Sequence, residues 1–227
     1  MKHKAILGIL TLLLVVTGAF LAFLLSNPPR SGGNLYTVLT AIPEPEAVPP
    51  FQFTNHENAP FSDADLQGDW TLLFFGFTNC PDICPPTLAE LRTFVNRLDG
   101  QAPTPRVMLV SVDPERDTPA VLKRYVSTFH PDFEGIVGPD SALIALAKYF
   151  GIYAEKIPSG TAMNHGTADS SHVDMHAHQG HDAASQDYVI NHSGYVLVTD
   201  PEGRYAGVFS PPHDAEQMIT AWRDFTR

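Results

Sequence analysis

Residues 70–91, WTLLFFGFTNCPDICPPTLAEL, carry the local pattern that decides the fold. The apolar run at 70–77 is typical of a strand that is buried on both faces of a helix-covered sheet. Residues 86–98 predict a helix, because apolar side chains recur along one face: Leu88, Leu91, Val95 and Leu98. The only two cysteines of the chain, Cys80 and Cys84, lie in the loop between this strand and this helix.

Strands and helices alternate through the rest of the chain. We expect a short strand, a turn and a second short element after Phe51, and an apolar strand at 106–113. Thr118 followed by Pro119 predicts a helix start, and Asp140 predicts another. The remaining predicted elements are a hairpin with strands at 195–200 and 205–210 and a last helix from Asp214. This order predicts an α/β domain whose central sheet is flanked by helices.

The N-terminus predicts a membrane anchor. An uncharged apolar run covers residues 5–25, and about 20 apolar residues span a bilayer as a helix. This run is longer than the core of a signal peptide, and no A-x-A cleavage pattern follows it. Lys2 and Lys4 favour a cytoplasmic N-terminus. We therefore expect residues 1–25 to form one transmembrane helix in a bacterial inner membrane, with the rest in the periplasm or another extracytoplasmic space.

Two segments differ in composition from the predicted domain. Residues 26–50 are rich in Pro, Gly and Ser, which predicts a flexible linker between the anchor and a domain at 51–227. Residues 158–187 are polar and too long for an ordinary connection, which predicts an insertion. The insertion contains several potential metal ligands: His165, His172, Met175, His176, His178 and His181.

The charge balance excludes one class of partner. The chain has 25 acidic and 14 basic residues, for a formal net charge of −11. Nucleic-acid binding needs clustered Lys and Arg, so we expect no nucleic-acid partner. An acidic protein is compatible with a cationic partner, including a metal ion.

Cys80 and Cys84 lie where thiol chemistry is favoured. Cys84 comes just before the predicted helix start, where peptide N–H groups and the helix dipole stabilise a thiolate. Thioredoxins place C-x-x-C at the same junction, and here the spacing is one residue longer. In an oxidising compartment the pair is a structural disulfide, a redox pair or a soft metal site. A bridge this short constrains little of the unfolded chain, which favours a reactive role.

A metal site needs further ligands, and His192 is the best candidate. It immediately precedes the predicted hairpin strand, so a loop at the end of the sheet could bring it to the cysteines. Two thiolates suit Cu(I), and with an imidazole they can hold Cu(II). The spacing alone leaves open that His192 is a hydrogen-bonded histidine near the core.

Other charged residues lie close to this site in the sequence. Asp82 either adds negative charge beside a metal or accepts backbone N–H bonds that shape the loop. Asp113, Arg116 and Asp117 follow the strand at 106–113. They either order the site or only cap the next helix.

Four segments together resemble the Sco/SenC family: FGFTNCPDICPPTLAEL (75–91), SVDPERDTP (111–119), YVSTFHPDFEGIVG (125–138) and DYVINHSGYVLVTDPEGRYAGVF (187–209). The resemblance spans about residues 51–225. It implies a thioredoxin-like fold with a central mixed sheet, tethered by one N-terminal helix. It also implies one copper ion held by the positions of Cys80, Cys84 and His192.

The resemblance further implies a part in building the CuA centre of cytochrome c oxidase, with subunit II or another copper acceptor as the partner. Two roles are implied, copper delivery as a metallochaperone and reduction of the target's cysteines, and both use Cys80 and Cys84. The alternative is a metal-independent thiol–disulfide oxidoreductase, which does not need His192. A peroxidase is disfavoured, because position 77 is Phe where peroxiredoxins carry Thr or Ser.

The histidine-rich insertion departs from the common pattern of this family. Imidazole suits Cu(II), Zn and Ni, whereas the Met thioether suits Cu(I). Our hypothesis is a flexible second copper site that captures metal and passes it to the first site. The alternative is a solvated insertion with incidental metal affinity.

Overall fold

The computed structural model describes residues 38–152, 154–158 and 188–227. The chain divides into two units, Met1–Thr37 and Val38–Arg227, and the description concerns the second. Its strands are β1 (Leu39–Ala47), β2 (Gln52–Asn55), β3 (Pro60–Ser62), β4 (Thr71–Gly76), β5 (Arg106–Ser111), β6 (Glu134–Val137), β7 (Ala154–Pro158), β8 (Tyr188–His192), β9 (Val196–Thr199) and β10 (Arg204–Phe209). Its helices are η1 (Asp63–Leu66), α2 (Cys84–Arg97), α3 (Pro119–Ser127), α4 (Asp140–Tyr149) and α5 (Ala215–Phe225).

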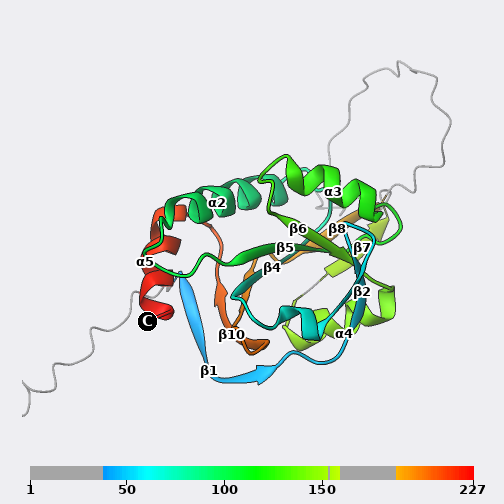
Figure 1. The fold of residues 1–227 in the computed structure, drawn as a ribbon. Helices are drawn as coiled ribbons and strands as arrows, with labels where there is room; N and C mark the ends of the chain where they lie inside the picture. Colours follow the sequence, from blue (N-terminus) through cyan, green and yellow to red (C-terminus); the bar gives the residue numbers. More distant parts are fainter. Residues whose placement is uncertain (1–37, 153, 159–187) are drawn as a thin grey trace, which may run out of the picture. The chain divides into compact units, whose positions relative to one another are not determined.

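A mixed sheet forms the centre of this unit. Its strand order is β1-β10-β9-β4-β5-β6-β2-β3, with parallel pairing from β4 through β5 to β6 and antiparallel pairing elsewhere. The helices α2 and α3 lie along one side of the sheet and α4 on the other (Figure 1). The predicted α/β class and the predicted mixed sheet are therefore confirmed.

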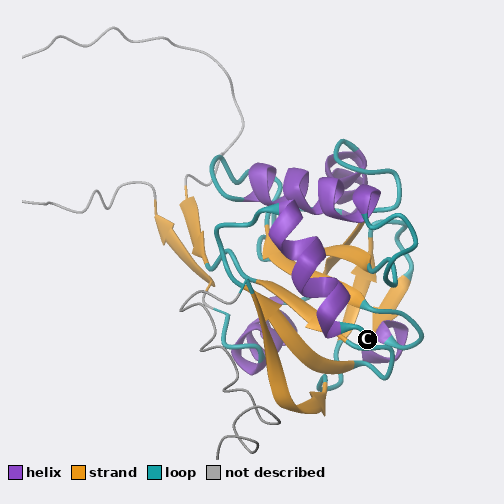
Figure 2. Cartoon of the chain, turned by 90° about the vertical axis from the view of Figure 1, so that its left-hand side faces the viewer, coloured by secondary structure: helices purple, strands orange, loops and turns teal. Residues whose placement is uncertain are grey.

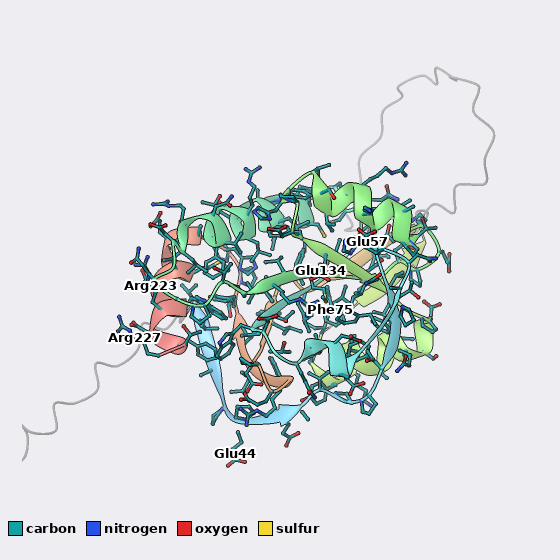
Figure 3. The ribbon with its side chains drawn as sticks, in the orientation of Figure 1. Glu44, Glu57, Phe75, Glu134, Arg223 and Arg227 are labelled. Atoms are coloured by element: carbon teal, nitrogen blue, oxygen red, sulfur yellow. The ribbon has the colours of Figure 1, made fainter. Side chains whose placement is uncertain are left out.

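β4 is the buried strand that the apolar run at 70–77 predicted. All six of its residues are buried, as both faces of the sheet are covered. The labelled Phe75 lies inside the domain, whereas Glu44 and Arg227 project outward (Figure 3). β4 and β5 pair in parallel up to Gly76 and Ser111, so the loops that follow the two strands leave the sheet at the same edge.

The last helix closes one side of the core. Asp214 caps α5, because its carboxylate accepts a hydrogen bond from the Gln217 N–H at 3.0 Å, as the sequence predicted. Trp222 of α5 is fully buried and lies against Phe94 of α2, with ring centroids 6.0 Å apart. Figure 2 shows α5 crossing in front of the sheet and ending at the C-terminus. Apolar packing between α5 and α2 thus holds the helix that begins at Cys84.

The predicted linker at 26–50 needs a correction, because residues 39–47 form β1. This strand pairs antiparallel with β10, with a register shift between Ala41 and Glu46. The sequence LTAIPEPEA suggested a linker because proline cannot donate to a strand ladder. β1 lies at the edge of the sheet, where one side of the backbone needs no partner strand and proline is tolerated.

Two sequence predictions lie outside the described residues. No helix among residues 38–152, 154–158 and 188–227 is long and apolar enough to cross a membrane, and the apolar run at 5–25 is not described. The predicted insertion at 158–187 falls almost wholly in the undescribed segment 159–187. The strands on either side of that segment, β7 and β8, pair with each other antiparallel.

Candidate metal centre

The cysteine loop connects β4 to α2, as the sequence predicted. Cys84 is the first residue of α2 and is fully buried, and Cys80 is only 8% exposed. The two residues are thiols with no disulfide between them. A turn brings the Cys80 N–H to the carbonyl oxygen of Phe77 at 3.2 Å. The loop therefore places two thiols together at the end of a buried strand.

The acidity expected for Cys84 is wrong for the metal-free protein. A hydrogen bond with the Cys80 thiol raises the pKa of Cys84 well above its ordinary value, and burial raises the pKa further. A hydrogen bond with the backbone of Phe77 opposes this rise. Cys84 is therefore a protonated thiol at neutral pH, and a metal must displace its proton to bind.

Gly76 leaves room for the Cys84 sulfur. A Cβ atom added at Gly76 would lie 2.8 Å from Cys84 Sγ and 3.0 Å from Leu109 Cδ1. Real Cβ contacts are essentially never shorter than 3.0 Å, so the contact with the sulfur is the one that an added Cβ could not make. The missing side chain at the end of β4 therefore allows the sulfur to pack directly against the strand backbone.

Asp117 holds the cysteine loop to the end of β5. Its Oδ2 accepts hydrogen bonds from the Thr78 N–H at 3.0 Å and the Ser111 hydroxyl at 2.7 Å, and its Oδ1 accepts one from the Thr78 hydroxyl at 2.6 Å. Burial raises the pKa of Asp117, and these hydrogen bonds from Thr78 and Ser111 oppose the rise. Of the two alternatives that the sequence left open, Asp117 orders the site.

The other polar residues near the cysteine loop have separate structural roles. Thr118 caps α3, because its hydroxyl accepts a hydrogen bond from the Val121 N–H at 3.4 Å. Asp113 is fully buried and forms an ion pair with Arg116. Asp82 is exposed on the loop between the cysteines. Helix capping and loop ordering are therefore done by different residues of the segment 113–118.

The strand that contains His192 ends beside the cysteine loop. His192 is the last residue of β8, where its backbone pairs with Ala154, and its side chain is outside the description. A Cβ added at Gly194, two residues further on, would lie 3.7 Å from Cδ1 of Ile83. Because Ile83 lies between the two cysteines in the sequence, the chain just after His192 is in contact with the loop that contains them.

His213, which follows β10, holds Gly194 in place near the cysteine loop. Its Nε2 lies 2.7 Å from the Gly194 carbonyl oxygen, so the ring donates a hydrogen bond from that nitrogen. Burial lowers the pKa of His213, an effect that the bond to Gly194 partly opposes, and the ring is neutral at pH 7. A groove of about 550 Å³ runs beside it, lined by Ile83, Pro86, Gly194 and His213 among others.

The described residues include only part of the predicted ligand sets. Within residues 38–152, 154–158 and 188–227, no three side chains of His, Cys, Asp or Glu are grouped so that they could hold a metal ion. Of the three predicted copper ligands, the structure brings Cys80 and Cys84 together through a hydrogen bond between their thiols and places the backbone of His192. The remaining candidates lie in the undescribed segment 159–187: His165, His172, Met175, His176, His178 and His181.

The SCO1/SenC family matches residues 40–174 of this chain. The chain belongs to the SCO1/SenC family. A relative of this SCO1/SenC chain, the mitochondrial SCO2 homolog of Mus musculus, is 30% identical over 175 residues, which make up 76% of this chain and 60% of that protein. The chain thus spans less than two thirds of the length of that relative.

Two solved structures with copper bound resemble this SCO1/SenC domain. ScoI of Arabidopsis thaliana has a TM-score of 0.64 at 25% identity, covering 79% of this chain and 98% of that one. ScoI of Bradyrhizobium japonicum has a TM-score of 0.61 at 28% identity, covering 79% of this chain and 99% of that one. The predicted thioredoxin-like fold is confirmed by these likenesses.

Three residues of the site gave no signal in the sequence. Gly76 contacts the Cys84 sulfur, His213 binds the segment after His192, and Tyr125 of α3 has a buried hydroxyl that the charges of both cysteines affect. Glycine, histidine and tyrosine occur at many positions without a functional role, so the residue type alone does not indicate a site. Only the tertiary contacts distinguish these three.

Proposed function

We propose that this protein is a membrane-anchored copper metallochaperone that binds one copper ion through Cys80, Cys84 and His192. The observation that carries the proposal is the approach of the segment after β8 to the cysteine loop, with Gly194 against Ile83. That contact brings the backbone of His192 toward a pair of buried thiols. The copper-bound relatives support the choice of metal.

The chemistry of the two thiols fits copper as the cargo. Soft thiolates favour Cu(I), and an added imidazole ligand permits Cu(II). Binding must release the proton of Cys84, because the pKa of this thiol is raised in the metal-free protein. Copper affinity therefore rises with pH, and protonation of the thiols assists release. A site of this kind can both hold copper and give it up to a partner with better ligands.

The second proposed role is reduction of the partner's cysteines. One thiolate of the pair attacks a disulfide of the target and forms a mixed disulfide, and the second cysteine displaces the target thiol. Two electrons pass to the target, which gains two thiols, and Cys80 and Cys84 become a disulfide. The hydrogen bond between these two thiols favours this role, because it shows that the sulfurs are already neighbours. The same chemistry without metal is the competing function.

The proposed location and partner follow from the N-terminal segment and the family. The apolar run at 5–25 would anchor the chain in a bacterial inner membrane, with the domain on the periplasmic side. The proposed acceptor is the CuA domain of cytochrome c oxidase subunit II or another copper-binding partner in the same compartment. Membership of the SCO1/SenC family supports a role in assembling such a copper centre.

The test deletes residues 160–185 and compares copper binding by this reduced protein with binding by its His192→Ala form. We expect one tightly held copper with a strong sulfur-to-Cu(II) absorption band, which the substitution abolishes or greatly changes. His130→Ala is the matched control, because the His130 ring contacts Asn96 at 3.3 Å, near the other end of α2 from Cys84. A sulfur-to-Cu(II) band that is the same in the His192→Ala form would favour the metal-free oxidoreductase.

The histidine-rich insertion has a separate proposed role in copper capture. Deleting residues 160–185 should slow loading at low copper concentration without removing the main site. Loading at limiting copper, followed by the same absorption band, measures this directly. An unchanged loading rate would leave the insertion as a solvated segment with incidental affinity.

A further inference from the structure

The hydroxyl of Tyr125 is enclosed and has no hydrogen-bond partner among the described residues. Tyr125 lies on α3, and its ring packs against Phe129 with centroids 5.3 Å apart. Buried hydroxyl groups are nearly always paired, because an unpaired one loses its hydration without compensation. The enclosed hydroxyl of this partly buried tyrosine therefore requires an explanation.

The surroundings of this hydroxyl are those of the candidate metal centre. Burial raises the pKa of Tyr125, and negative charge on Cys84, Cys80 and Asp117 raises it further. The phenol therefore keeps its proton at any physiological pH and is available as a donor. Its hydroxyl is close enough to both cysteines for their charge to affect it.

Asp117 does not serve as the acceptor. Its two carboxylate oxygens already receive three hydrogen bonds, two from Thr78 and one from Ser111. The cysteine sulfurs are the remaining acidic groups near the hydroxyl. In the metal-free protein the Cys84 thiol is hydrogen-bonded with Cys80. A cysteine binds copper as a thiolate, and a thiolate sulfur accepts hydrogen bonds from nearby donors.

We propose that the Tyr125 hydroxyl donates a hydrogen bond to a sulfur of the Cys80–Cys84 pair once that sulfur is bound to copper. Tyr125 is then a positioning residue that orients a thiolate ligand and adjusts the strength of the sulfur–copper bond. This inference rests on the proposed copper-binding function. It explains why a donor is kept without a partner in the metal-free state.

The role predicts opposite effects in the two states of the protein. Replacing Tyr125 with Phe removes only the oxygen, so the metal-free reduced protein should be as stable as the wild type or more stable. In the copper-loaded protein the same change removes a donor from a thiolate. The sulfur orbitals then rise in energy, so the sulfur-to-Cu(II) band should move to longer wavelength, and copper affinity should fall by about tenfold.

The experiment measures both states of the full chain for wild type, Tyr125→Phe and Tyr149→Phe. Tyr149 is the matched control, because its hydroxyl donates to the carbonyl oxygens of Glu46 and Ala47, on the strand β1. We expect Tyr125→Phe to lower copper affinity and shift the band with no loss of metal-free stability, and Tyr149→Phe to leave the band unchanged.

The possible outcomes test the role of Tyr125 separately from the proposed copper-binding function. If the wild type shows the sulfur-to-copper band and Tyr125→Phe leaves band and affinity unchanged, the inference is refuted and the copper site stands. The inference is also refuted if Tyr125→Phe loses affinity only in proportion to a loss of metal-free stability. A wild type without the band refutes the proposed function, and the inference with it.

Discussion

Replacing Gly76 with alanine should damage the copper site through one contact. The added Cβ would lie 2.8 Å from Cys84 Sγ, whereas ordinary contacts begin at 3.4 Å. The sulfur must therefore move by the difference, about 0.6 Å, unless the strand moves instead. It cannot move easily, because Cys84 is fully buried and is fixed at the first residue of α2.

The magnitude follows from the packing. Inserting a methyl group into a filled core costs about 1–3 kcal/mol of stability. The added methyl would also lie 3.0 Å from Leu109 Cδ1 and 3.2 Å from Phe74 Cε1, so we expect a loss within that range. A misplaced ligand should lower copper affinity by about 10–100-fold. Urea unfolding of the reduced, metal-free protein measures the first effect, and competition with a Cu(I) chelator measures the second.

Gly135→Ala is the matched control for this prediction. Gly135 lies in β6, and a Cβ there would meet the Leu122 Cβ at 3.0 Å, in a similarly tight contact without sulfur. We expect Gly135→Ala to lose comparable stability and to keep its copper affinity. Wild-type copper affinity in Gly76→Ala, or an equal loss of affinity in both variants, would refute the reasoning.

Three further predictions concern groups around the site. The raised pKa of Cys84 means that its contribution to stability is present below the ordinary thiol value of 9.0 and lost above it. The free energy of unfolding of the metal-free protein should therefore fall above pH 9.0 by up to about 1.4 kcal/mol per pH unit. An equal slope in Cys84→Ser would contradict this. Asp117→Ala should cost about 1–3 kcal/mol in chemical denaturation, because the Thr78 N–H loses its acceptor. Asp117→Asn should cost less, since it keeps a carbonyl oxygen, and the reverse order would disprove the role. The lowered pKa of His213 gives stability above its ordinary value of 6.5 that is lost as pH falls below it. Acid unfolding below pH 6.5 should thus be shallower in His213→Gln, and identical slopes would exclude the buried ring as the cause.

Most of the fold could be read from local patterns. A continuous apolar run predicts β4, because a strand covered on both faces has no polar side. Thr118 and Asp214 predict the starts of α3 and α5, because their side chains satisfy the first free N–H groups of a helix. Strand β1 could not be predicted, since its prolines indicate a linker unless a neighbouring strand is known to pair with it.

The sequence by itself determined the identity of the predicted ligands and their place on the chain. The two cysteines between a predicted buried strand and a predicted helix must lie in the loop at the end of that strand. Only tertiary structure showed that the Cys80 thiol and burial raise the pKa of Cys84. Tertiary structure alone also brought Asp117 and Tyr125 to the loop. Such contacts join residues far apart in the chain, so their energies depend on packing that no local pattern records.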